Sequence, residues 1–321
     1  MNYKPILIIH GEPNSVFLEI FFKSLKYKQF RNPLILICSE KLLKFQMKKL
    51  KFKMDINILN LSSLNKIKLN NKTINVIDIK YNKNLNFQRI SNKSNDYIKN
   101  CFETALKILK SGITNKFING PISKDSFLNK KFLGITEYLT KKTKANQNAM
   151  LIYNNRLSVC PITTHLPLKS VVKNITKKQI IEKISLIDIF YKKYLGFKPK
   201  IAVLGLNPHC ESIHRFNEDQ KIIKPTIKFL SNKKINIKGP YSADTAFLKK
   251  NRENIDVIVG MYHDQVLTPI KTLYEYDAIN ITLGLPFLRI SPDHGPNQKM
   301  LGQNKSNPLS LIRAIEFLEK N

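Results

Sequence analysis

The feature that most constrains this chain is the alternation of short apolar runs with amphipathic segments along its whole length. Runs such as Ile6-Leu7-Ile8-Ile9 have the length and the apolar content of buried strands, and the segments between the runs repeat apolar residues at helical spacing. Strands separated by helices need crossover connections, which join parallel strands. The sequence therefore predicts an α/β fold with doubly wound, mainly parallel sheets.

The predicted elements extend over most of the chain. Strands are expected at residues 5–9, 33–38, 75–79, 116–118, 149–153, 157–160, 201–205, 256–259 and 278–282. The clearest helical stripes run over residues 98–109, 180–194 and 311–318. Because 321 residues exceed the size at which a single hydrophobic core usually stops growing, two domains are expected.

The net charge of +31 invites a nucleic-acid-binding interpretation. Against it, only seven of the 54 basic residues are arginine, which is the residue best suited to bidentate phosphate and base recognition. The lysines are spread along the chain, and no zinc-finger or basic-zipper pattern accompanies them. We therefore expect no nucleic-acid partner, and a basic surface that attracts small anions. A non-catalytic nucleic-acid-binding protein is the alternative from a different functional class.

The apolar runs also bear on the cellular compartment. None approaches the roughly 18 apolar residues of a membrane span, and the run that follows Lys4 ends too soon for a signal peptide. The four cysteines, Cys38, Cys101, Cys160 and Cys210, form no C-x-x-C pair and fit ordinary thiols in a reducing compartment. A cytoplasmic protein without a membrane partner is expected.

Three histidines follow predicted strands at equivalent positions. His165 follows the strand at 157–160, His209 the strand at 201–205, and His263 the strand at 256–259. In doubly wound folds, ligands bind beyond the carboxyl ends of the strands. Neutral imidazoles that converge there suit a divalent transition metal such as zinc. Magnesium and cobalt are the alternative cofactors. A single such histidine would more often be structural, but three together favour a metal site.

Other side chains near these positions are candidates for supporting roles. Asp264 and Asp244 would orient metal-bound imidazoles, although Asp244 could equally be a helix N-cap. Lys271, Asn280 and Arg289 follow downstream. Arginine is scarce here, and Arg289 lies between two apolar residues, which favours a phosphate or carboxylate clamp. Neither a G-x-G-x-x-G nor a Walker loop is present, so a nucleotide is not expected to bind in the Rossmann manner.

These segments resemble the 4-hydroxythreonine-4-phosphate dehydrogenase family of pyridoxal phosphate biosynthesis, whose fold is that of isocitrate and isopropylmalate dehydrogenases. The matching segments run in order from about residue 117 to the C-terminus. They are Thr163-Thr164-His165-Leu166-Pro167-Leu168, Gly205-Leu206-Asn207-Pro208-His209, Ala243-Asp244-Thr245, Met261-Tyr262-His263-Asp264-Gln265, Asn280-Ile281-Thr282-Leu283-Gly284-Leu285-Pro286-Phe287 and Ser291-Pro292-Asp293-His294-Gly295.

The resemblance implies a set of site residues and an assembly. His165, His209 and His263 would bind the metal, with His263 contributed by the second subunit of a homodimer that shares its active sites. Asp244 and Asp264 would support the site. Substrate contacts would come from Thr136, Lys271, Asn280 and Arg289, and Lys271 could also relay the hydroxyl proton.

The resemblance also implies an activity and a domain division. NAD or NADP would oxidise the 3-hydroxyl of 4-phosphooxy-L-threonine, and the β-keto acid would lose carbon dioxide to give 3-amino-2-oxopropyl phosphate. Residues 1–132 with 296–321 would form the domain on the cofactor side, and residues 133–295 would form the domain with the metal and the dimer interface. A cleft would separate the two doubly wound α/β/α domains.

The chain departs from the family pattern in three places. The glycine-rich segment near the N-terminus has lost most of its glycines between Gly11 and Glu19, Ile135 replaces a substrate-contacting histidine, and the loop after His209 is shortened to Cys210-Glu211-Ser212-Ile213-His214. These changes leave the three histidines intact. They keep open a second substrate class, the phosphorylated four-carbon acids phospho-threonate and phospho-erythronate. His10 and His214 are expected to be incidental to catalysis.

Overall fold

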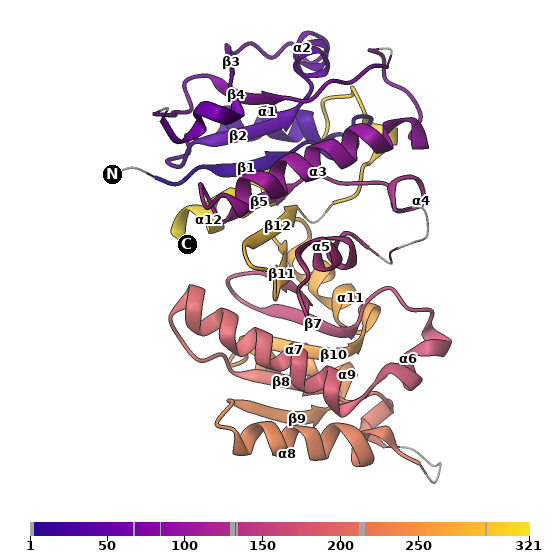
Figure 1. Ribbon diagram of the computed structural model, residues 1–321. Helices are drawn as coiled ribbons and strands as arrows, with labels where there is room; N and C mark the ends of the chain where they lie inside the picture. The colour runs from indigo at the N-terminus through magenta and orange to yellow at the C-terminus, as the bar shows by residue number, and fades with distance from the viewer. Residues whose placement is uncertain are drawn as a thin grey trace. The chain divides into compact units, whose positions relative to one another are not determined.

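The computed structural model describes residues 3–66, 68–83, 85–128, 132, 134–211, 216–292 and 294–321 (Figure 1). The chain divides into two compact units. Unit 1 comprises Met1–Ile135 and Pro286–Asn321, and unit 2 comprises Thr136–Leu285. Unit 1 is therefore built from both ends of the chain, with unit 2 inserted between them in sequence.

Unit 1 contains a parallel sheet with the strand order β3-β4-β2-β1-β5-β12. The strands are β1 (Ile6–Ile9), β2 (Leu34–Cys38), β3 (Ile56–Ile58), β4 (Ile74–Asp78), β5 (Lys116–Asn119) and β12 (Leu288–Pro292). The main helices are α1 (Phe17–Tyr27), α2 (Glu40–Lys49), α3 (Asn95–Lys110) and α12 (Leu309–Lys320), with the short α4 (Lys124–Phe127). Helix α3 crosses in front of the sheet in Figure 1 and packs on β1 and β2, and α12 packs on β5 and β12 and against α1.

Unit 2 contains strands in the order β11-β6-β7-β10-β8-β9. They are β6 (Ala149–Tyr153), β7 (Ser158–Thr163), β8 (Ile201–Leu204), β9 (Ile237–Tyr241), β10 (Val257–Tyr262) and β11 (Ile279–Leu283). Its helices are α5 (Ile135–Thr143), α6 (Leu168–Asn174), α7 (Lys177–Phe190), α8 (Lys224–Asn232), α9 (Ala243–Ala246), α10 (Lys249–Arg252) and α11 (His263–Tyr274). Strand β6 runs antiparallel to β7 and β11, whereas β7, β10, β8 and β9 are parallel.

The α/β class and the predicted strands are confirmed, and local sequence explains the elements. The central strands are apolar and fully buried because helices cover the sheets. Helix α7 begins where the Thr176 side chain accepts a hydrogen bond from Gln179 N, and its buried residues Ile180, Ile184 and Ile187 recur at helical spacing. In the first turn of α9, Asp244 follows the N-cap residue Ser242, so the alternative that Asp244 is the cap is wrong.

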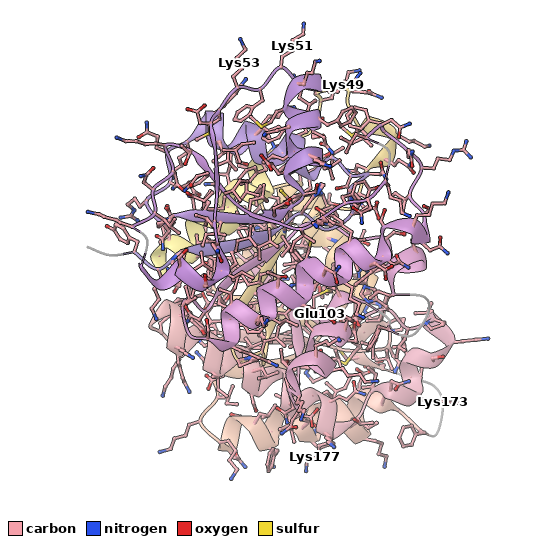
Figure 2. All side chains as sticks on the ribbon, turned by 45° about the horizontal axis from the view of Figure 1, so that its top comes forward. Lys49, Lys51, Lys53, Glu103, Lys173 and Lys177 are labelled. Carbon is pink, nitrogen blue, oxygen red and sulfur yellow. The ribbon has the colours of Figure 1, made fainter. Side chains whose placement is uncertain are left out.

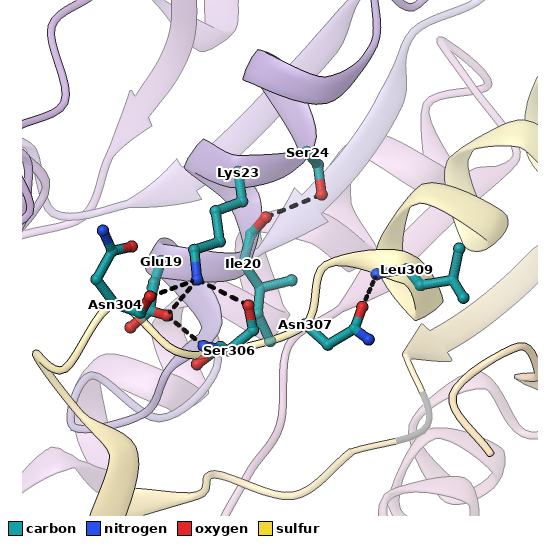
Figure 3. A network of polar contacts seen from close by, with 8 residues as sticks. All are labelled: Glu19, Ile20, Lys23, Ser24, Asn304, Ser306, Asn307 and Leu309. Carbon is teal, nitrogen blue, oxygen red and sulfur yellow. Dashed lines mark hydrogen bonds and ion pairs between the residues drawn. The ribbon is translucent and has the colours of Figure 1, made fainter.

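Polar contacts around the buried Glu19 connect the C-terminal segment to α1 in unit 1 (Figure 3). The Lys23 ammonium donates to Glu19 Oε1 at 3.0 Å and to the backbone carbonyls of Asn304 and Ser306 at 2.9 and 2.8 Å. Ser306 N donates to the same Glu19 oxygen at 2.6 Å. Glu19 is buried, so the charge-assisted bond from Ser306 N to its carboxylate competes little with water and helps to hold the segment that leads into α12.

The basic charge lies on the surfaces of both units (Figure 2). Lys49, Lys51 and Lys53 project from the end of α2 and the loop after it, while Lys173 and Lys177 project from unit 2. In the described part of the chain, no helix has the length and the apolar character required to cross a membrane.

Candidate active site

The three candidate metal ligands follow three neighbouring strands of unit 2. Strand β10 pairs in parallel with β7 on one side and with β8 on the other. His165 lies just after the end of β7, His263 is the first residue of α11 directly after β10, and His209 lies in the short 3₁₀ turn η4 (Pro208–Cys210) after β8. Since the carboxyl ends of parallel strands meet at one edge of a sheet, the fold carries all three side chains to the same edge.

His165 and His263 approach one another within the chain. Their ring centroids lie 5.8 Å apart, and the ring planes are inclined by 40°. His263 Nδ1 lies 2.6 Å from Asp264 Oδ1, and Asp264 is mostly exposed. A carboxylate on Nδ1 fixes the orientation of the imidazole and leaves Nε2 as its second nitrogen.

His209 differs from the other two histidines in its backbone conformation. It is exposed, and its backbone is left-handed, with φ of 54°, as is that of Cys210, with φ of 61°. A left-handed conformation costs a non-glycine residue roughly 1–2 kcal/mol, so this turn needs support from its surroundings.

Among the described residues of one chain, no group of three or more His, Cys, Asp or Glu side chains is arranged to hold a metal ion. The donor chemistry of three imidazoles on adjacent strand ends nevertheless fits a divalent transition metal.

A hydrogen-bonded link that sequence reasoning missed connects the ends of these strands. Gln265 accepts from Met261 N at 2.7 Å and donates through Nε2 to the Gly205 carbonyl at 2.8 Å. Thr163 Oγ1 donates to the Met261 carbonyl at 2.8 Å. The link therefore runs from the end of β7 through β10 to the loop after β8.

Asp219 also supports the loop after β8, at Leu206 and Asn207. Its fully buried carboxylate accepts from Leu206 N at 2.7 Å, from Asn207 N at 3.1 Å and from Asn207 Nδ2 at 2.9 Å. Burial raises the pKa of the neighbouring Cys210 thiol, and the charges of Asp219 and Asp244 contribute to the rise. Exposed Asp244 therefore lies within electrostatic reach of the turn that carries His209.

The predicted substrate contacts of unit 2 are Thr136, Lys271 and Asn280. The buried hydroxyls of Thr136 and Thr282 lie 3.3 Å apart, which joins α5 to β11. Asn280 lies two residues before Thr282, on the same face of β11. Asn280 Oδ1 is buried without a hydrogen-bond partner among the described residues, so it is an acceptor that a bound donor could satisfy. Lys271 is half-buried on α11, two turns beyond His263.

Arg289 belongs to unit 1 and is completely buried. It lies on β12, which pairs with β5, and its Nε donates to Asn119 Oδ1 at 2.6 Å. Arg289 is the largest fully buried side chain among the described residues of the chain. The buried arginine therefore has a structural role in unit 1, where it joins β12 to β5.

His10, at the end of β1, is also fully buried, and its Nδ1 lies 3.3 Å from the Tyr97 hydroxyl. Burial lowers the pKa of His10 from 6.5 to about 3. Between pH 6.5 and about pH 3, His10 binds a proton in the unfolded chain but stays neutral in the folded chain. The free energy of unfolding therefore falls as the pH falls through this range. The other predicted incidental histidine, His214, lies outside the described residues.

We predict that His10→Asn, which keeps an acceptor for Tyr97, makes the protein less sensitive to acid. Between pH 6 and pH 4 the wild type should lose about 2.5 kcal/mol more of its free energy of unfolding than the variant, because one extra proton binds the unfolded chain at roughly 1.4 kcal/mol per pH unit. Urea unfolding across this range measures the difference. Parallel pH profiles for the two proteins would contradict the prediction.

Comparisons with known proteins point to one family. A family model described as pyridoxal phosphate biosynthetic protein PdxA matches residues 29–318. A 4-hydroxythreonine-4-phosphate dehydrogenase from Sulfurihydrogenibium sp. (strain YO3AOP1) is 39% identical over 318 residues, covering 97% of this chain and 96% of the relative. A D-threonate 4-phosphate dehydrogenase from Salmonella typhimurium is 30% identical over 324 residues, covering 99% and 98%. The crystal structure of 4-hydroxythreonine-4-phosphate dehydrogenase from Klebsiella pneumoniae gives a TM-score of 0.84 at 28% identity, covering 98% of this chain and 96% of that chain.

Proposed function

Because this chain belongs to the family of pyridoxal phosphate biosynthetic proteins PdxA, we propose that it is the dehydrogenase of that pathway. It oxidises the 3-hydroxyl of 4-phosphooxy-L-threonine with NAD or NADP in the cytoplasm, and the β-keto acid then loses carbon dioxide to give 3-amino-2-oxopropyl phosphate. The observation that carries the proposal is the order of β7, β10 and β8, which brings His165, His263 and His209 to one edge of the sheet.

His165, His209 and His263 are the proposed ligands of a divalent cation, zinc first and magnesium or cobalt as alternatives. When bound, the cation would lower the pKa of the substrate hydroxyl, and the nicotinamide would accept the hydride. Asp264 holds the His263 ring through Nδ1, at 2.6 Å. Asp244, beside the His209 turn, supports the same ligand set.

The remaining proposed contacts bind and orient the substrate. The unsatisfied acceptor Asn280 Oδ1 suits an amine or a hydroxyl of the substrate. Thr282 lies on the same face of β11 as Asn280, and its hydroxyl pairs with that of Thr136 from α5. Lys271 binds the phosphate or carboxylate, or takes the hydroxyl proton. Arg289 is the proposed phosphate clamp.

We further propose that the active form is a homodimer in which His263 completes the metal site of the partner. Helix α6 directly follows His165 and exposes Leu168 and Val172, at 69% and 47%, one helical turn apart on one face. An apolar pair exposed beside a metal ligand suits burial against a second copy of the chain.

The test is the reduction of NAD and of NADP by the purified protein, given 4-phosphooxy-L-threonine, with and without a chelator. We expect turnover that the chelator abolishes and added Zn²⁺ restores, because the hydroxyl pKa is lowered only by the bound cation. The absorbance of the reduced nicotinamide measures turnover. Activity that is indifferent to the chelator would contradict the metal site.

A second candidate is the oxidation of phosphorylated four-carbon acids such as D-threonate 4-phosphate. Two observations favour it: the full-length similarity to a D-threonate 4-phosphate dehydrogenase, and Ile135 in place of a family histidine. Assays of both substrates in parallel decide between the two, since the metal site and the clamp would be shared. A kcat/KM that is higher for the four-carbon acid than for 4-phosphooxy-L-threonine would overturn the first proposal in favour of the second.

A further inference from the structure

We propose that Gln265 and Asp219 are positioning residues that hold the loop carrying His209 and the strand end carrying His263, and thereby set the affinity for the metal. In the proposed homodimer these two histidines of one chain serve different sites, so the restraint acts on one ligand of each site. This inference rests on the proposed metal site. Neither residue is a metal ligand. Both act through the loop Gly205–His209: Gln265 bonds to Gly205, and Asp219 bonds to Leu206 and Asn207.

Gln265 makes the connection between the two loops. It is 9% exposed, and both ends of its amide are used: Oε1 accepts from Met261 N at 2.7 Å, and Nε2 donates to the Gly205 carbonyl at 2.8 Å. Met261 lies two residues before His263, and Gly205 lies four residues before His209. The amide is therefore a direct bridge between the two ligand-bearing segments, which lie far apart in sequence.

Asp219 fixes the loop beyond the bridge. It is fully buried, and its two carboxylate oxygens accept three hydrogen bonds from Leu206 and Asn207. The next residues, Pro208 to Cys210, form the turn in which two consecutive non-glycine residues are left-handed. A turn with unfavourable backbone angles persists only when its surroundings hold it, and the Asp219 carboxylate supplies that restraint.

The backbone packs tightly against the side chains of Gln265 and Asp219 at two glycines. A Cβ atom at Gly205 would lie 2.6 Å from Cys210 Sγ and 2.8 Å from Asp219 Oδ1. A Cβ atom at Gly260 would lie 2.5 Å from Val266 Cγ1 and 2.9 Å from Gln265 Oε1. Both glycines are therefore needed for the two polar side chains to reach the backbone. Thr163 Oγ1, which donates to the Met261 carbonyl, extends the restraint to the strand that precedes His165.

A metal site tolerates only small errors in ligand position, and groups that orient the ligands typically contribute 10- to 100-fold to affinity. Gln265→Met preserves volume but removes both hydrogen bonds. The matched control is Tyr191→Phe, which removes a buried hydrogen bond of 2.9 Å to Ser158 at the opposite end of the same sheet. Both variants lose buried hydrogen bonding, so both should have a lower free energy of unfolding than the wild type.

The experiment measures the dissociation constant of Zn²⁺ for the full-length protein by competition with a metal-sensitive dye, and the absorption spectrum of the Co²⁺ form. We expect Gln265→Met to bind Zn²⁺ about 10- to 100-fold more weakly and to show an altered Co²⁺ spectrum. Tyr191→Phe should stay within about twofold of the wild type, because its lost bond is remote from the ligands.

Equal Zn²⁺ affinity in Gln265→Met and Tyr191→Phe would overturn the inference while leaving the proposed function intact. If Gln265→Met does not fold, Asp219→Asn provides the test, since it keeps one acceptor oxygen and should weaken Zn²⁺ binding about tenfold. Unchanged affinity in Asp219→Asn would likewise overturn the inference. A wild-type protein that binds no Zn²⁺ would instead refute the metal site itself.

Discussion

A heterodimer that combines one His165→Ala chain with one His263→Ala chain is expected to recover about half of the wild-type activity, although each variant alone is inactive. If each site takes His165 and His209 from one subunit and His263 from the other, one of the two sites in this heterodimer carries both substitutions and the other carries none. Each homodimeric variant should lose activity about 1,000-fold or more, since the loss of the cation removes several kcal/mol of transition-state stabilisation.

The experiment needs two affinity tags, so that only mixed dimers are purified from co-expressed chains, and NAD or NADP reduction measures their activity. The matched control is the heterodimer of His165→Ala with His209→Ala. It should stay inactive, because both of its sites then lack a ligand. His165 and His263 of one chain have ring centroids 5.8 Å apart, so a site formed within one chain is the competing arrangement. That arrangement would leave both heterodimers inactive.

The second large effect is expected at Arg289. Its replacement by Met should lower the free energy of unfolding by about 3 kcal/mol or more, because Asn119 Oδ1 loses its buried charged donor. It should also lower kcat/KM by about 100-fold or more, because the loss of a buried charge-assisted contact to a phosphate costs roughly 2–5 kcal/mol. Thermal unfolding and steady-state kinetics measure the two effects separately.

Binding of inorganic phosphate distinguishes a clamp from a purely structural arginine. Phosphate should raise the unfolding temperature of the wild type, since a ligand that binds only the folded state stabilises it, and it should leave Arg289→Met unchanged. Arg313→Met is the matched control, because Arg313 is half exposed on α12 and forms an ion pair with Glu316 at the surface. An Arg289→Met protein that phosphate still stabilises would show that the guanidinium serves the fold alone.

Sequence predicted most of the strands, several of which are continuous apolar runs such as β1 and β8, and it missed three. Arg289 interrupts β12, and Gly239-Pro240 interrupts β9, which lies at the edge of the sheet, where proline is tolerated. The third missed strand, β3, is a short edge strand with polar Asn57. One antiparallel strand, β6, also departs from the mainly parallel expectation.

The family resemblance read from the motifs is confirmed, and the strand-end positions of the histidines could be predicted because each comes within a few residues of the end of a predicted strand. The restraint by Gln265 and Asp219 could not be predicted. Gln265 and Gly205 are 60 residues apart, and nothing local to either predicts the contact. Asp219 had no signal beyond a lone acidic residue. Its burial depends on packing that only the folded chain creates. The metal ligands, the substrate contacts and the dimer remain predictions.

The return of the C-terminal segment to α1 has a consequence for how this protein is made. Strand β12 and helix α12 complete unit 1, yet the ribosome synthesises them after all 150 residues of Thr136–Leu285. Domains generally fold during synthesis in the order in which their residues emerge. Here the unit that begins first is finished last. Before Ser306 contacts Glu19 and Lys23, the sheet of unit 1 lacks β12, the strand that pairs with β5. At that stage the residues of the inserted unit have already been synthesised.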